Sequence, residues 1–188
     1  MLSLIVFLPL AGAMVILLLK EARQIRLLAA AVTVVELVLT IVVFVIYDKG
    51  TGDMQLEELY SGWIPALNIQ YHLGVDGLSV PLLLLTGLLG MCAVFASWHV
   101  QLRVKEYFMW LLVLQTAVTG VFVSLDFVLF FIFWELELLP MYFLISIWGS
   151  GRREYSAMKF IIFTILGSAF MLVGILALYF SVGTFSMV

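Results

Sequence analysis

The longest apolar stretch of the chain covers residues 107–148 and reads YFMWLLVLQTAVTGVFVSLDFVLFFIFWELELLPMYFLISIW. A helix needs about 20 residues to cross the hydrocarbon core of a bilayer, so this stretch is too long for one span. Its only break is Ser124-Leu125-Asp126. The stretch therefore predicts two membrane-spanning helices, 107–125 and 126–148, joined by a tight turn.

Four more apolar runs surround this stretch, at 2–19, 27–47, 76–97 and 157–180. Each is long enough to cross a bilayer. Hydrophobic residues make up 65% of the chain and charged residues 11%, and the mean hydropathy is +1.22. A soluble domain carries about 25% charged residues. The sequence thus predicts an all-α, polytopic membrane protein with about six transmembrane helices.

The run 2–19 could be mistaken for a secretory signal peptide. It has no basic residue before it and no convincing small-residue cleavage site before Lys20. A basic residue before the apolar run and a small-residue cleavage site after it are features of a signal peptide. We therefore expect the run to be a retained helix.

Basic residues decide the predicted orientation. The loops 20–26, 98–106 and 149–156 fall on one side of a six-span chain and carry Lys20, Arg23, Arg26, Arg103, Lys105, Arg152 and Arg153. On the other side, only Lys49 accompanies several acidic residues. Loops rich in Lys and Arg stay in the cytoplasm. Loop 48–75 and both termini are accordingly predicted to be external.

Other chemistry-bearing residue types are sparse. The net charge of −3 gives no indication of nucleic-acid binding. The single cysteine, Cys92, lies in an apolar run, where we expect a small buried side chain and neither a disulfide nor a metal site. His72 and His99 lie at span edges, where interfacial hydrogen bonding is expected and titration is the alternative. No phosphate loop, nucleophile constellation or redox-cofactor motif is present.

Charged residues inside membrane spans are costly and mark functional positions. Glu135 lies about ten residues into its span, roughly 15 Å deep. Pro140 has no N–H to donate to the carbonyl of Leu136, which loosens the helix beside the glutamate. Burial favours the neutral acid, whereas a nearby cation favours the carboxylate. Glu135 is therefore a candidate for proton transfer, with a purely structural hydrogen bond as the alternative.

Glu137 follows two positions later, roughly 200° around the helix, so it faces another direction. Proton transfer and structural bonding are both open for it. The face of Glu135 continues at Tyr142 and Ser146, which make a thin polar path towards the cytoplasmic end.

Glu36 and Lys159 are the remaining charged residues in spans. Glu36 lies midway in its span, and a protonated interhelical hydrogen bond is expected, with transport as the alternative. Lys159 starts the last span, where its side chain can extend to the cytoplasmic interface or face a proton path. Small residues spaced along two helices are expected to allow close helix packing; they are Thr116, Gly120, Ser124, Gly167 and Gly174.

Two stretches carry a family resemblance: YHLGVDGLS at 71–79, and FWELELLPMYFL at 133–144 followed by AMKF at 157–160. Both resemble the M-type (chain 4, or plastid D-type) subunit of the NADH:quinone oxidoreductase family, complex I. The resemblance runs over essentially the whole chain. Such subunits are similar to Mrp-type cation/proton antiporters and have about fourteen helices with inverted repeats.

The resemblance implies a division of the chain. Residues 1–106 would form an N-terminal three-helix segment with external loop 48–75, and 107–188 the incomplete start of the first antiporter-like repeat. Glu135 matches the family's glutamate of the fifth helix, whose lysine partner would lie beyond Val188. The chain is therefore expected to be a fragment, a truncated reading frame or one piece of a split subunit.

The function implied is that of a proton-translocating membrane-arm subunit of a complex I-like NADH (or ferredoxin):quinone oxidoreductase. Quinone, FMN and iron–sulfur clusters would belong to partner subunits of the membrane and peripheral arms, and this chain would hold no cofactor. The expected location is a bacterial plasma membrane or a thylakoid-like membrane. Alternatives are an Mrp-type antiporter subunit, a membrane-bound hydrogenase subunit and a structural fragment that does not pump.

Overall fold

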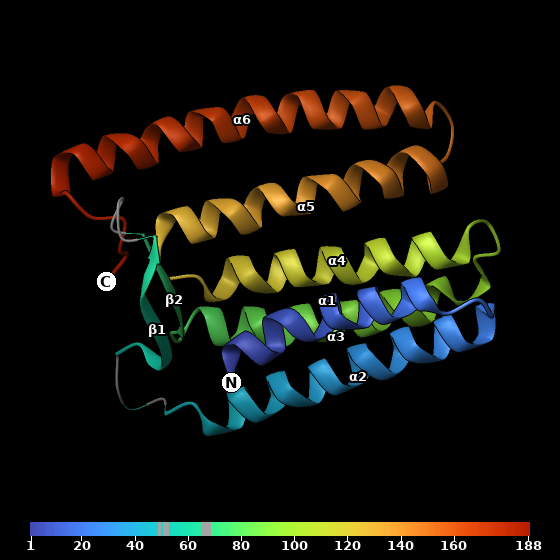
Figure 1. Ribbon diagram of the computed structural model, residues 1–188, viewed down its shortest axis with the longest axis horizontal. Coiled ribbons are helices and arrows are strands. Elements are labelled where there is room, and N and C mark those ends of the chain that lie inside the picture. The colour runs from blue at the N-terminus through green and yellow to red at the C-terminus, as the bar shows by residue number, and fades with distance from the viewer. Residues whose placement is uncertain (49, 51–52, 65–68) are drawn as a thin grey trace.

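The protein is a bundle of long helices capped at one end by a β-hairpin (Figure 1). A computed structural model describes residues 1–188 except 49, 51–52 and 65–68. The helices are α1 (Leu2–Leu18), α2 (Ala22–Ile46), α3 (Ser79–Ala96), α4 (Val104–Val123), α5 (Phe127–Trp148) and α6 (Arg153–Val182), and the short 3-10 helix η2 (Ser97–His99) follows α3. The strands are β1 (Gln55–Ile64) and β2 (Ile69–Val75).

The predicted spans are confirmed within a few residues. Helices α2 to α6 are each long and apolar enough to cross a membrane, and α1 is a shorter apolar helix of 17 residues. Helices α1 to α4 pack on one another, whereas α5 lies on α4 and α6 lies on α5 (Figure 1). The last two helices thus extend the bundle as a row.

The predicted tight turn between α4 and α5 is present. Asp126 ends the turn, and its Oδ1 accepts hydrogen bonds from the backbone N–H of Val128 at 2.8 Å and of Leu129 at 3.2 Å. An aspartate at this position satisfies amides that begin a helix and have no partner within it. Ser124 Oγ donates to the carbonyl of Gly120 at the end of α4. The short polar break thus contains the cap of the helix that carries Glu135.

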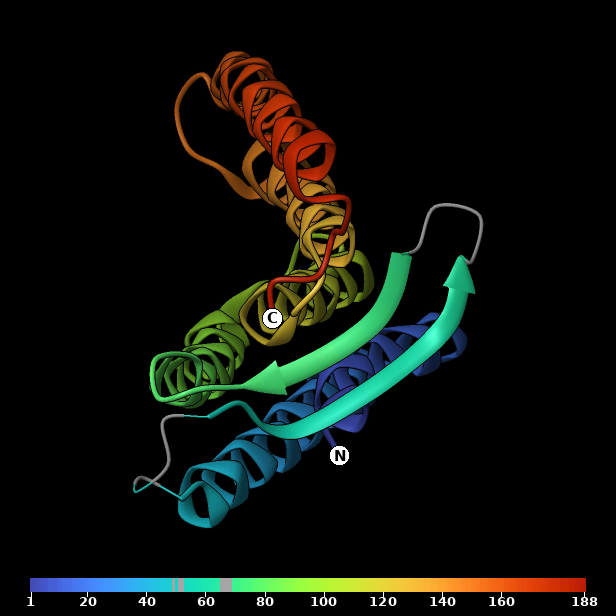
Figure 2. The same ribbon diagram turned by 90° about the vertical axis from the view of Figure 1, so that its left-hand side faces the viewer.

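The hairpin is an addition to the all-α prediction. Strands β1 and β2 pair antiparallel within loop 48–75 and lie across the end of the bundle (Figure 2). The backbone N–H of Leu125 donates to the carbonyl of His72 at 2.9 Å. A Cβ on Gly74 would lie 2.5 Å from Leu125 Cδ1, so the glycine allows the hairpin to approach the turn. The stretch 71–79 is therefore the packing seam between hairpin and helices.

The three basic loops share the end of the bundle opposite the hairpin, as the topology prediction requires (Figure 1). At this end Arg26 Nη2 donates to the carbonyl of Val100 and Lys105 Nζ to that of Leu17, both at 2.8 Å. These cations satisfy backbone carbonyls near helix ends. Which end is cytoplasmic stays a prediction, and Lys49 lies outside the described residues.

Cys92 is exposed, so the expectation of a buried side chain is wrong. The buried face of α3 includes Gly90 and Val94. Cys92 lies two residues after Gly90, roughly 200° around the helix, and points away from the bundle. A thiol behaves as a small apolar group, and lipid accepts such a group as readily as a protein core does.

The two sets of small residues behave differently. A Cβ on Gly120 would lie 2.3 Å from Phe133 Cδ1, so α4 and α5 approach closely there, as predicted. Thr116 and Ser124 on the same helix are also buried. At Gly167 and Gly174 a Cβ would meet no described atom within 4 Å. The packing predicted for α6 is therefore not made within the described part of the chain.

Candidate proton-transfer site

Glu135 lies in the middle of α5, which packs between α4 and α6 (Figure 1). Its side chain is half-buried, and Oε1 is buried without a hydrogen-bond partner among the described residues. An ionised carboxylate without a partner is costly away from water. This carboxyl therefore needs either a proton or a group from outside the described chain.

Pro140 lies within α5 and is buried, yet the helix continues to Trp148. Because proline has no N–H, the carbonyl of Leu136 receives no helical hydrogen bond from position 140. The predicted loosening is thus local and does not break the span. An acceptor without its helical donor lies one residue beyond Glu135.

Glu137 is also half-buried, on the same helix. Lys159 on α6 is exposed, and its Nζ lies 5.8 Å from the centroid of the Phe163 ring, within reach of a cation–π interaction. No ion pair between described residues joins Lys159 to Glu135 or Glu137. The structure therefore does not pair Lys159 with either glutamate in the described part of the chain.

Tyr142 and Ser146 are half-buried on α5. The ring of Tyr142 lies edge-on to that of Phe143, with 5.4 Å between centroids. Ser146 Oγ donates to the carbonyl of Phe143 at 3.3 Å, which is a bond within its own helix. These positions share one helical face with Glu135. That they conduct protons remains a prediction.

Glu36 has a different environment from Glu135. It is fully buried between α2 and α4, and its Oε1 accepts from Gln115 Nε2 at 3.2 Å and from Thr119 Oγ1 at 3.1 Å. The interhelical hydrogen bond predicted for it is therefore present. The sequence prediction lacked Gln115 and Thr119, although two polar residues four apart in an apolar span are a signal for such a partner.

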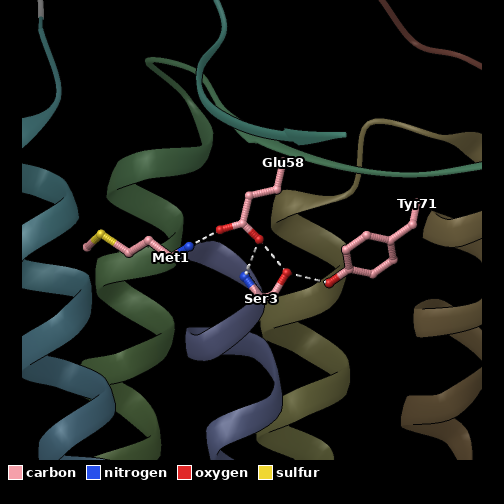
Figure 3. A network of polar contacts seen from close by, with 4 residues as sticks. All are labelled: Met1, Ser3, Glu58 and Tyr71. Atoms are coloured by element: carbon pink, nitrogen blue, oxygen red, sulfur yellow. Dashed lines mark hydrogen bonds and ion pairs between the residues drawn. The ribbon is translucent and has the colours of Figure 1, made fainter. Parts of the chain in front are cut away.

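The hairpin end holds a polar network that ties α1 to both strands (Figure 3). The amino group of Met1 and the Ser3 hydroxyl contact the Glu58 carboxylate, and the Ser3 backbone N–H donates to Glu58 Oε2 at 3.1 Å. Ser3 Oγ and the Tyr71 hydroxyl share a hydrogen bond of 2.8 Å. Burial raises the pKa of Tyr71, which keeps the phenol neutral.

Two further polar contacts lie within β2 and directly after it. His72 Nε2 lies 3.0 Å from Glu57 Oε2, which confirms the hydrogen bonding expected of this histidine. Asp76 Oδ1 accepts from the backbone N–H of Ser79 at 2.7 Å and of Leu78 at 3.2 Å. Hydrogen bonds from Ser79 hold the pKa of Asp76 below its usual range. The carboxylate thus caps the start of α3.

Comparison with known proteins places this geometry in a class. Residues 124–188 match the family described as NADH:quinone oxidoreductase/Mrp antiporter, transmembrane. A subunit of respiratory complex I from Thermus thermophilus with bound NADH superposes with a TM-score of 0.85 over 99% of this chain and 38% of that one, at 23% identity. A chain of the Mrp complex from a Dietzia species gives 0.81 over 98% and 20%, at 19% identity. The fold is that of part of an antiporter-like membrane subunit.

Sequence similarity to individual relatives covers nearly the whole chain. The chain is 41% identical to NAD(P)H-quinone oxidoreductase chain 4 2 of Thermosynechococcus vestitus over 99% of its length, and 42% identical to chain 4 of Gloeobacter violaceus over 100%. It spans 35% and 36% of those proteins, about a third of their length. The resemblance to chain 4 is confirmed. The apolar helices and these relatives indicate an integral protein of a bacterial or thylakoid membrane.

Proposed function

We propose that this chain contributes to proton translocation in the membrane arm of a complex I-like NAD(P)H (or ferredoxin):quinone oxidoreductase. The observation that carries the proposal is the carboxyl of Glu135. It lies at mid-span in a chain similar to chain 4 throughout its length, and one of its oxygens is buried without a partner among the described residues. Charged groups at such positions mark ion pathways.

The proposed role of Glu135 is reversible proton binding. A cation from a neighbouring helix outside the described chain would stabilise the carboxylate, and withdrawal of that cation would favour the neutral acid. Glu137, Lys159, Tyr142 and Ser146 are proposed as further members of the path. Partner subunits would supply quinone reduction together with FMN and iron–sulfur clusters. The same proposal divides the chain between residues 106 and 107, into an N-terminal three-helix segment and the start of the first antiporter-like repeat.

An Mrp-type antiporter subunit is the second candidate, favoured by the superposition on the Mrp complex. The two functions differ in what drives the protons. Inverted membrane vesicles that contain the whole assembly would be loaded with a pH-sensitive dye. Addition of NAD(P)H or reduced ferredoxin should quench the dye if proton movement is coupled to electron transfer. Quenching driven only by an imposed sodium gradient would overturn the redox assignment.

A further inference from the structure

Helices α2 and α3 pack on each other and on α4, on the far side of α4 from α5 (Figure 1). Several of the buried residues on these three helices are polar. The group is centred on Glu36, which is 0% exposed. Other buried polar residues on the three helices are Thr33, Thr40, Thr86, Gln115 and Thr119. Charged groups are rare at such depth, and nothing in the role of Glu135 uses this one.

The amide of Gln115 holds one oxygen of the acid. Its Nε2 donates to Glu36 Oε1 at 3.2 Å and to the carbonyl of Thr86 at 3.0 Å, so both amide hydrogens have acceptors. A Cβ on Gly90 would lie 2.3 Å from Gln115 Oε1, so this glycine makes room for the amide. Thr119 Oγ1 adds a second donor to Glu36 Oε1 at 3.1 Å.

The other oxygen, Oε2, is buried without a hydrogen-bond partner among the described residues. With both donors on Oε1, a proton on the acid belongs on Oε2. The bonded oxygen then remains the carbonyl, and the site accommodates the neutral acid. The same two donors partly stabilise the carboxylate when the proton leaves.

Few charged groups approach this site. Helix α1 carries no titratable residue, and α3 carries only Cys92. The remaining titratable residues on α2 and α4 lie in the first turns of their helices, roughly 12–20 Å along the axis from the acid; they are Arg23, Arg26, Lys105, Glu106 and Tyr107. No described cation therefore pairs with Glu36, and the neutral form is favoured in this low-dielectric setting.

We propose that Glu36, Gln115 and Thr119 form a second proton-binding site in the membrane, at which Glu36 holds an exchangeable proton on Oε2. Gln115 and Thr86 also line an open, mostly apolar pocket of about 240 Å³ between α3 and α4, so the amide that holds the acid borders the outer surface of this helix pair. Exchange releases the proton from Oε2 and leaves a carboxylate whose Oε1 keeps both hydrogen bonds. The site goes beyond the proposed function of Glu135 and does not depend on it.

Infrared difference spectroscopy of the purified assembly tests the site without reference to pumping. Subtraction of the Glu36→Gln spectrum should reveal a neutral carboxyl C=O band at neutral pH. The band should disappear reversibly at alkaline pH while a carboxylate band appears. Absence of the neutral band at every pH would overturn the proposal, and so would a band that no pH removes, since that is a static hydrogen bond.

A second pair of variants keeps Glu36 in place and covers the case in which Glu36→Gln does not assemble. Thr119→Val removes one donor from the carbonyl oxygen and should move the C=O band to higher frequency. Thr116 is the matched control, because it is buried on the same helix but donates to the carbonyl of Leu112. Thr116→Val should leave the band unchanged. Equal spectra for wild type and Thr119→Val would contradict the assignment.

Discussion

The two halves of the bundle differ in the hydrogen bonds that they give to a carboxyl inside a span. Between α2 and α4, Glu36 is fully buried and receives two hydrogen bonds. On α5, Glu135 is half-buried, and its buried oxygen has no partner among the described residues. The first acid is fixed by its own chain. The second is left for a group that the described chain does not supply, which is what a proton-transfer residue that exchanges counter-ions requires.

The packing of glycines also differs between the two parts of the bundle. Gly120 lies against Phe133 where α4 meets α5, whereas Gly167 and Gly174 on α6 meet no described atom. Polar contacts at the hairpin end also concentrate on α1, α3 and the start of α5. The helices before α5 thus carry more of the described packing and polar contacts, and α6 leaves glycines without a packing partner among the described residues.

The largest expected effect separates the two acids on α5. Glu135→Gln keeps the size and hydrogen bonding of the side chain but cannot ionise, and it should slow redox-driven proton uptake by about 100-fold or more, the usual scale for removal of an acid–base group. Glu135→Asp should retain part of the rate. Glu137→Gln, on another side of the helix, should do less. Dye quenching in vesicles with equal amounts of assembled complex measures all three, and equal rates for Glu135→Gln and Glu137→Gln would remove the distinction.

The next effect concerns stability around Glu36. Glu36→Leu leaves the donors of Gln115 and Thr119 without their acceptor, at a cost of about 1–3 kcal/mol for each buried group. We expect a clear loss of assembled complex. Glu135→Leu removes no described hydrogen bond and should lower the yield much less. Native gel electrophoresis of solubilised membranes compares the two, and a greater loss with Glu135→Leu would reverse our account of which acid is held by hydrogen bonds from its own chain.

A smaller effect compares two glycines. Gly120→Ala places a methyl group 2.3 Å from the Phe133 ring, and overpacking of this kind costs about 1–3 kcal/mol. Gly167→Ala meets no described atom and should not destabilise the chain. The thermal midpoint of the complex in detergent reports both changes. Equal losses would show that the face of α6 is packed as tightly as the seam between α4 and α5.

The smallest effect is at the cap of α3. Asp76→Ala should cost about 1 kcal/mol of stability, the usual worth of an N-cap. Because hydrogen bonds from Ser79 lower the pKa of Asp76, the contribution is present above the unfolded-state pKa and is lost as the pH falls through the folded-state value. Asp76→Asn should keep most of the cap without this acid dependence. Thermal midpoints measured from neutral to acidic pH test this pH dependence. If the midpoints of wild type and Asp76→Asn fall in parallel with decreasing pH, the prediction is contradicted.

The sequence predicted most of the helical architecture, because apolar runs and the break at Ser124-Leu125-Asp126 are local signals. It missed the hairpin, whose strand Gln55–Ile64 mixes charged, aromatic and glycine residues and pairs with residues Ile69–Val75. It also identified Glu36 without its partners, since the choice of Gln115 and Thr119 depends on how α2 and α4 pack. Similarly, the exposure of Cys92 depends on which face of α3 turns inward.

The ratio of protons translocated to electrons transferred tests the central claim most directly. Both quantities would be measured in the same vesicles for wild type and for an assembled Glu135→Gln complex. If Glu135 takes up and releases protons in the proposed way, the ratio should fall in the variant, with electron transfer slowed as well. An unchanged ratio in a fully assembled Glu135→Gln complex would contradict the account and leave Glu135 a structural residue.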